Sequence, residues 1–362
     1  MGIDKMREKL EEVVPFVGMV VMEGCTIGLT ILAKSAFSAG LSPYVFVVYT
    51  NAIGSLLLLP YSFFYHRLDS TEEPLFTFPI LLRIFFLGLT GIALAQNLAF
   101  VGLYHSSPIV VCAMGLLIPA FSFILAFILR TTKLEWRSAS FQFKVLGTLI
   151  SFMGAIVEEV YRGPYIRPSS LRQIKRFLVF SSTEGNWILG GTLIAASSLC
   201  ISIWNIIQLD TIKRHPQVMK IASVYSLVGT ILCAAFSLIM ERDLNAWKLK
   251  LNWELLLIIV TAIFGGVIRS SVQTSCARMK GPFYVPMFQP FRIFWATFFG
   301  VGFFTNSLQY GSVVGAIVAG IGYYTVSWGQ IREDAENKVR NSSDEKVPLL
   351  QQDEDNDEEE QV

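Results

Sequence analysis

Two charged residues, Glu23 and Arg292, lie deep inside apolar stretches of the sequence. Each is about ten residues from the end of a stretch long enough to cross a bilayer, which in a helix is a depth of roughly 15 Å. A charge at that depth is costly unless it is paired, protonated or reached by water. We expect the two side chains to face a common cavity as an ion pair, or as partners for the ammonium and carboxylate groups of an amino acid. The alternative is a buried structural pair, or a protonated Glu23 hydrogen-bonded to a neighbour.

Polar side chains elsewhere in the apolar stretches could orient a solute through hydrogen bonds. Beside the charged pair, the candidate binding residues are Gln96, Asn97, Gln273, Thr274 and Gln289. The same groups also join helices to one another in membranes, which is the alternative for them. Arg269 lies only about eight residues from the end of its stretch, so its stem could run along the helix to water. Snorkelling or a structural role is therefore an alternative to solute contact for Arg269.

Pro119 and Pro290 each fall in the middle of an apolar stretch. Proline lacks a backbone N–H and leaves a carbonyl oxygen without its helical donor. Where the helix lines a cavity, water or solute can satisfy that oxygen. We expect a helix break at each proline, with a simple packing kink as the alternative.

No pattern in the sequence suggests catalysis or a bound cofactor. There is no P-loop, no strand-linked GxGxxG and no Ser/His/Asp grouping. The five cysteines are widely spaced in apolar stretches, without CxxC or Cys/His pairs that would bind a metal. The balance of 29 Lys+Arg against 28 Asp+Glu is neutral, and no basic stretch is interleaved with aromatic residues as nucleic-acid binding requires. We expect no catalytic residues, no metal, no cofactor and no nucleic-acid partner.

The residues named above must be positioned by membrane-spanning helices. Hydrophobic residues make up 53% of the chain and charged residues 16%, with a mean hydropathy of +0.52. Apolar runs of about 20 residues recur along it, and no barrel-type alternation is present. We expect an all-α membrane protein, embedded in the lipid bilayer by ten transmembrane helices at residues 13–33, 43–65, 80–104, 109–129, 143–161, 187–209, 217–240, 253–277, 283–305 and 310–329.

The distribution of Lys and Arg predicts that both termini are cytosolic, because basic residues are denser in the segments on that side. Residues 1–12 would form a cytosolic N-terminus. The tail at 330–362 has few aromatic residues and an acidic end, so we expect it to be disordered and solvated. Within it, the pattern from Glu345 to Leu350 fits an acidic dileucine signal, which sorting adaptors can read.

An internal repeat is suggested by matching turns and small-residue motifs. Ser107-Pro108 precedes one span as Gly281-Pro282 precedes another, and Lys144-Val-Leu-Gly147 parallels Ser312-Val-Val-Gly315. The simplest account is a duplication of five helices, with halves at 13–161 and 187–329 and an extramembrane loop at 162–186. An odd number of spans in each half inserts the second half upside down, which is a recurrent transporter architecture.

The motifs in order resemble a known family. They are Ser106-Ser-Pro108, Pro119-Ala-Phe-Ser-Phe123, Lys280-Gly-Pro282, Phe288-Gln-Pro290 and the glycine-rich run at 311–329. Their order and spacing are similar to those of the plant nodulin-21-like, walls-are-thin-related (UmamiT) family of the drug/metabolite transporter superfamily, whose members carry two EamA repeats. The resemblance implies ten helices, cytosolic termini and transport of amino acids, often as a facilitator that permits export. Some relatives carry auxin or other metabolites.

We therefore expect a transporter of amino acids or similar small organic solutes that works by alternating access. One alternative is a carrier for auxin or another organic anion, with Arg292 or Arg269 as its positive site. Another is a membrane receptor or scaffold that moves nothing. The plasma membrane is favoured over the vacuolar membrane. Gly311 and Gly315 form a GxxxG pattern that would allow close packing within the chain or in a homodimer.

Overall fold

The computed structural model describes residues 2–65, 78–129, 138–161, 186–214, 218–249, 251–280, 284–303 and 310–344. Its elements in chain order are α1 (Gly2–Ser38), α2 (Pro43–Tyr65), α3 (Phe78–Gly88), η2 (Leu89–Leu94), α4 (Ala95–His105), α5 (Pro108–Gly115), α6 (Ile118–Ile128), α7 (Ala139–Val160), α8 (Trp187–Arg214), α9 (Val218–Met240), α10 (Trp253–Ile263), η3 (Phe264–Ile268), α11 (Arg269–Lys280), η4 (Pro286–Phe288), α12 (Phe291–Phe303) and α13 (Tyr310–Asp344).

The expected all-α membrane protein is confirmed. Within the described ranges, nine helical stretches are long and apolar enough to cross a membrane. They correspond to nine of the ten expected spans. The remaining span, expected at 283–305, consists of the short 3-10 turn η4 and the 13-residue helix α12.

Two helices extend further than the sequence predicts. Helix α1 continues to Ser38, so Lys34 is a buried residue of that helix and not a loop residue. Helix α13 continues to Asp344, so the prediction of disorder is wrong for residues 330–344. The sorting pattern from Glu345 to Leu350 lies outside the described residues.

Corresponding spans of the two halves share the same irregularities. A π-turn interrupts the third span at η2, between α3 and α4, and another interrupts the eighth span at η3, between α10 and α11. The fourth span breaks between α5 and α6, and Pro119 lies in the first turn of α6. Pro290 lies between η4 and α12. A break at proline follows from its missing N–H.

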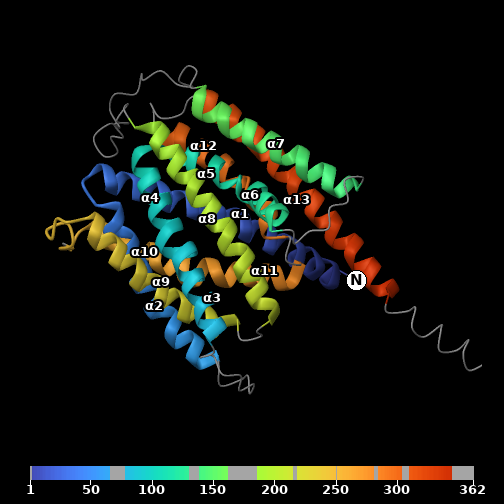
Figure 1. The fold of residues 1–362 in the computed structure, drawn as a ribbon, viewed down its shortest axis with the longest axis horizontal. Coiled ribbons are helices and arrows are strands. Elements are labelled where there is room, and N and C mark those ends of the chain that lie inside the picture. Colours follow the sequence, from blue (N-terminus) through green and yellow to red (C-terminus); the bar gives the residue numbers. More distant parts are fainter. Residues whose placement is uncertain are drawn as a thin grey trace, which may run out of the picture.

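The packing between the halves is also reciprocal. Helices α3 and α4 of the third span pack against α8 and α9 of the second half. Helices α10 and α11 of the corresponding eighth span pack against α1 and α2 of the first half. Helices α7 and α13 lie side by side along much of their length, as Figure 1 shows in green and red. Such reciprocal packing is what a duplicated five-helix unit would produce.

Small residues bring α7 and α13 into backbone contact. A Cβ atom built on Gly315 would lie 2.5 Å from the amide nitrogen of Glu158 on α7, so this glycine packs within the chain. The second glycine of the GxxxG pattern is therefore used internally. The other face of α7 carries exposed apolar side chains suited to lipid, namely Leu146, Leu149, Met153 and Ile156.

We expect Gly147→Ala to destabilise the protein. The added methyl group would lie 2.6 Å from the backbone nitrogen of Val326, and overpacking of this kind typically costs about 1–3 kcal/mol. Gly28→Ala on α1 is the matched control, because no atom lies within 4 Å of a Cβ there. Thermal unfolding in detergent should show a lower midpoint for Gly147→Ala only. Equal midpoints for the two variants would contradict this account of the α7–α13 contact.

Candidate functional site

A buried ion pair joins the first and ninth spans. Arg292 of α12 donates from Nε to Oε2 of Glu23 of α1, with a separation of 2.5 Å. The side chain of Glu23 is 1% exposed and that of Arg292 is 18% exposed. The two side chains thus form an ion pair, which both the expected solute site and its structural alternative contain. It places opposite charges between elements that come from different halves of the chain.

Arg269 lies at the same site. It is the first residue of α11, directly after the π-turn η3, and interacts electrostatically with both Glu23 and Arg292. Within the part of the chain that the structure describes, Arg269 forms no hydrogen bond or ion pair of its own. The surroundings of the pair thus include a second guanidinium group and also a second buried carboxylate, because Glu158 of α7 is 3% exposed and interacts electrostatically with Cys112 of α5.

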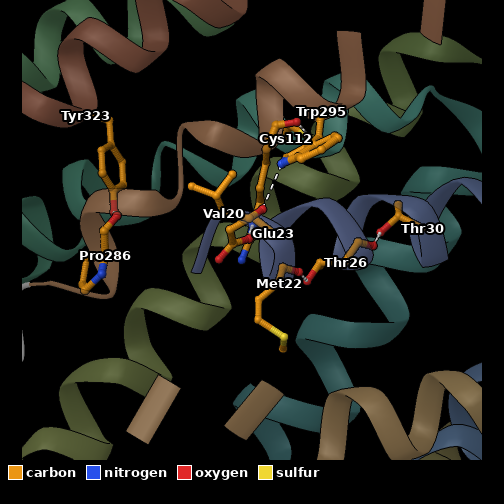
Figure 2. A network of polar contacts seen from close by, with 10 residues as sticks. Val20, Met22, Glu23, Thr26, Thr30, Cys112, Pro286, Trp295 and Tyr323 are labelled. Atoms are coloured by element: carbon orange, nitrogen blue, oxygen red, sulfur yellow. Dashed lines mark hydrogen bonds and ion pairs between the residues drawn. The ribbon is translucent and has the colours of Figure 1, made fainter. Parts of the chain in front are cut away.

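Aromatic packing fixes the position of α12 against α1. The indole Nε1 of Trp295 donates to the carbonyl oxygen of Val20 at 2.9 Å, and Figure 2 shows this bond beside Glu23. Gly24 makes the approach possible, because a Cβ there would lie 2.8 Å from the Trp295 ring. The ring of Phe299 stacks on that of Trp295, with the two ring centroids 5.5 Å apart. Sequence reasoning missed Trp295, although Gly24 beside a buried carboxylate is a signal for close packing.

Two further residues surround the pair. The thiol of Cys112 on α5 lies 3.8 Å from the carbonyl oxygen of Arg292 and interacts electrostatically with both charged residues. Tyr323 of α13 is buried, interacts electrostatically with Arg292 and donates its hydroxyl to the carbonyl oxygen of Pro286 at 2.7 Å. Figure 2 shows Tyr323 and Pro286 together, away from Glu23. Sequence reasoning singled out neither Cys112 nor Tyr323 as a site residue.

The amides of the third span form a separate cluster. Gln96 accepts a hydrogen bond from Asn51 of α2 at 2.6 Å. Asn97 is buried, donates to Cys233 of α9 at 3.1 Å and accepts from Ser237 at 3.4 Å. These bonds join α4 to α2 and α9, and neither amide is hydrogen-bonded to Glu23 or Arg292. Gln96 and Asn97 therefore form hydrogen bonds between helices, which was the alternative to solute contact for these two residues.

The remaining predicted residues lie on or near α11. Gln273 is half-buried on that helix, and the side chain of Thr274 lies outside the described residues. Gln289 is half-buried at the break before α12, and its carbonyl oxygen accepts the backbone N–H of Arg292 at 3.1 Å. Sequence reasoning did not single out three exposed serines on the same helix, Ser270, Ser271 and Ser275.

A loop closes the end of the molecule opposite the N-terminus. Residues 241–249, here named the strap, follow α9. Glu241 accepts a hydrogen bond from Ser42 at 2.7 Å, and the carbonyl oxygen of Trp247 accepts one from Tyr49 at 2.9 Å. Nearby, Lys34 donates to the carbonyl oxygen of Tyr104 at the end of α4, at 2.6 Å. These bonds tie the ends of α1, α2, α4 and α9 together.

Two further ion pairs join helices of the first half to helices of the second. Lys144 of α7 is buried and pairs with Glu333 of α13 at 2.6 Å, while Arg83 of α3 pairs with Asp210 of α8 at 2.6 Å. Helix α11, in contrast, packs mainly on η3 and α1, whereas its counterpart α4 packs on α8, α2, α5 and α1. The polar helix α11 is thus the least enclosed part of the spans.

The described residues contain no group of three or more His, Cys, Asp or Glu side chains that could hold a metal ion. A bundle of apolar helices long enough to span a bilayer is the architecture of a multi-pass membrane protein.

Comparison with known proteins identifies the family. Residues 17–157 match the EamA-like transporter family. Two WAT1-related proteins of Arabidopsis thaliana are 54% and 56% identical to this chain, over 96% and 94% of its length and 94% and 93% of theirs. The chain therefore belongs to the WAT1-related family of membrane transporters, as its motifs indicated.

The fold is also found among solved structures. One described as "Crystal structure of protein" superposes with a TM-score of 0.51 at 14% identity, and the match covers 88% of this chain and 97% of that one. This similarity concerns the fold alone.

Proposed function

We propose that this transporter carries amino acids or similar small organic solutes by alternating access, as a facilitator or exporter. The observation that carries the proposal is the Glu23–Arg292 pair, which is buried between helices of the two halves. An amino acid offers one ammonium and one carboxylate, and these groups match the two charges of the pair. Binding between the halves would let their relative movement expose the solute to each side in turn.

The proposed machinery is a pair of inverted five-helix repeats at 13–161 and 187–329. Three observations support it: the π-turns in corresponding spans, the breaks beside Pro119 and Pro290, and the reciprocal packing of the halves. In this scheme both termini are cytosolic and the strap is extracellular or luminal. The plasma membrane is the favoured location, with the vacuolar membrane as the alternative.

The arrangement of the two ends supports an inward-facing state. The strap bonds close the outer end, while Ser270, Ser271 and Ser275 on the cytosolic half of the eighth span are exposed. Polar groups at membrane depth are not tolerated against lipid, so water would reach them from the cytosol. The outward-facing state would then enclose α11 and release the strap.

A second candidate is transport of auxin or another organic anion. The observation that favours it is the second guanidinium group, that of Arg269, which interacts electrostatically with the pair. A carboxylate without an ammonium group would pair with a guanidinium group there. This candidate differs from the first in solute charge and not in mechanism.

Uptake by purified protein in liposomes tests the proposal. Labelled amino acids and labelled indole-3-acetate would be offered separately, with protein-free liposomes as the control. Saturable uptake of amino acids supports the first candidate, and uptake of indole-3-acetate alone supports the second. A protein that moves neither solute would instead fit a receptor or scaffold.

A further inference from the structure

The segment that leads into Arg292 has 3-10 geometry. The backbone N–H of Gln289 donates to the carbonyl oxygen of Pro286 at 3.1 Å, and that of Arg292 donates to Gln289 at 3.1 Å. Each of these bonds spans three residues, as in the 3-10 turn η4 before them. Relaxing three residues to α-helical geometry would rotate the next side chain by roughly 60°, because a 3-10 helix turns about 120° per residue and an α-helix about 100°. The direction in which Arg292 points therefore depends on this segment.

Pro290 removes the helical donor of one carbonyl group in the segment. In an α-helix the N–H of residue 290 would donate to the carbonyl oxygen of Pro286, but proline has no N–H. The hydroxyl group of Tyr323 on α13 donates to that oxygen at 2.7 Å, as Figure 2 shows. Tyr323 is 3% exposed and packs in a buried cluster with Ile293 of α12. A side chain of α13 thus supplies the bond that the proline cannot make.

The next tyrosine of α13 makes a similar bond in a different setting. The hydroxyl group of Tyr324 donates to the carbonyl oxygen of Met287 at 3.0 Å. Residue 291, the α-helical donor for that oxygen, is a phenylalanine and keeps its N–H. Tyr324 is 40% exposed and Met287 is 44% exposed, so water can take the place of this hydroxyl group. Of the two tyrosines, only Tyr323 bonds to the carbonyl group that the proline leaves without its helical donor.

Apolar contacts hold the opposite side of the segment against α1. The ring of Phe16 lies edge-on to those of Phe288 and Phe291, with centroid separations of 5.4 Å and 6.2 Å. Aromatic contacts tolerate small rotations, whereas a hydrogen bond weakens steeply as its angle departs from linear. The bond from Tyr323 therefore fixes the rotation of the segment more closely than its packing on α1 does.

We propose that Tyr323 is a positioning residue for transport. Its hydroxyl group replaces the donor that Pro290 lacks, keeps the segment in its 3-10 geometry and so directs Arg292 toward Glu23 and the solute. The inference rests on the proposed transport function and adds to it a residue that acts through the backbone of the ninth span.

A double-mutant cycle between Tyr323 and Pro290 tests the role, with leucine uptake by the full chain in liposomes as the measurement. Tyr323→Phe should raise the half-saturation concentration about fivefold, the loss typical of one hydrogen bond, with little change in the maximal rate. In the Pro290→Ala background, residue 290 has an N–H for the Pro286 oxygen. Adding Tyr323→Phe there should change the half-saturation concentration less than about twofold. A purely structural loss would instead lower the maximal rate through fewer folded molecules.

Tyr324→Phe is the matched control, since it removes the same hydroxyl group from the neighbouring position. Its half-saturation concentration should stay within about twofold of the wild-type value, because water can replace its bond. If Pro290→Ala does not transport, the unfolding midpoints of the same four proteins in detergent make the comparison. The expected result is then a lower midpoint for Tyr323→Phe that disappears in the Pro290→Ala background.

Three results would overturn the positioning role and leave the proposed transport standing. They are an unchanged half-saturation concentration in folded Tyr323→Phe, an equal effect of Tyr323→Phe in both backgrounds, and an equal effect of Tyr324→Phe. Wild-type protein that moves no leucine would overturn the proposed transport of amino acids. The midpoints of the four proteins would still show whether the Tyr323 hydroxyl group replaces the missing donor.

Discussion

Arg292→Gln is expected to reduce solute uptake by at least about a hundredfold and to lower the stability of the protein markedly. The substitution leaves the carboxylate of Glu23 at 1% exposure without the guanidinium that it contacts. Removing one partner of a buried pair typically costs about 3–5 kcal/mol, because the other charge stays buried. The positive charge of Arg269 also interacts electrostatically with Glu23 and would offset part of that loss, so we expect the lower end of this range. Uptake in liposomes and thermal unfolding in detergent measure the two effects.

The double variant Glu23→Gln/Arg292→Gln separates stability from transport. Two neutral amides in place of the pair can hydrogen-bond to each other, so most of the lost stability should return. Transport should not return, because neither charge is available to the solute. A double variant that transports at nearly the wild-type rate would show that the pair is only structural. Such a result would remove the main support for the proposed site.

Linking the strap to the start of α2 should block transport almost completely. Ser42→Cys and Glu241→Cys would place thiols where the two side chains now share a hydrogen bond of 2.7 Å. A short bifunctional thiol reagent would then hold the strap closed and prevent the outward-facing state. We expect uptake to fall to the level of protein-free liposomes after crosslinking, and to recover when a cleavable linker is reduced.

The controls for this experiment are the two single-cysteine variants treated with the same reagent. Native Cys25 is exposed and Cys200 is half-buried, so both would first be replaced by serine. Full uptake by the crosslinked double variant would mean that the strap need not open. Alternating access through that end would then be wrong.

The sequence was informative where depth and hydropathy determine structure. Apolar runs located the helices, and the similar depth of Glu23 and Arg292 predicted their ion pair. The end of α1 was predicted too early because hydropathy falls at Lys34. The helix instead continues to Ser38 and ends in a turn in which Gly40 has a φ of 109°, a conformation that suits glycine, and Leu41 donates to the carbonyl oxygen of Ala36.

The position of Arg269 could not be predicted in the same way. The π-turn η3 precedes it, and one extra residue in a turn rotates the following helix by about 100° relative to a regular α-helix. The face that Arg269 presents therefore depends on an irregularity that has no clear sequence signal. Likewise, Asn97 and Gln96 had the chemistry of solute ligands, but the packing of α9 and α2 against α4 determined their partners.

Counterflow in liposomes tests the central claim most directly. Liposomes containing the purified protein and loaded with unlabelled leucine would be diluted into a trace of labelled leucine, and phenylalanine would be examined in parallel. A carrier that binds solute between two halves and exposes it alternately predicts transient accumulation of label above its external concentration. Uptake of label that only approaches equilibrium, with no dependence on the internal solute, would contradict alternating access.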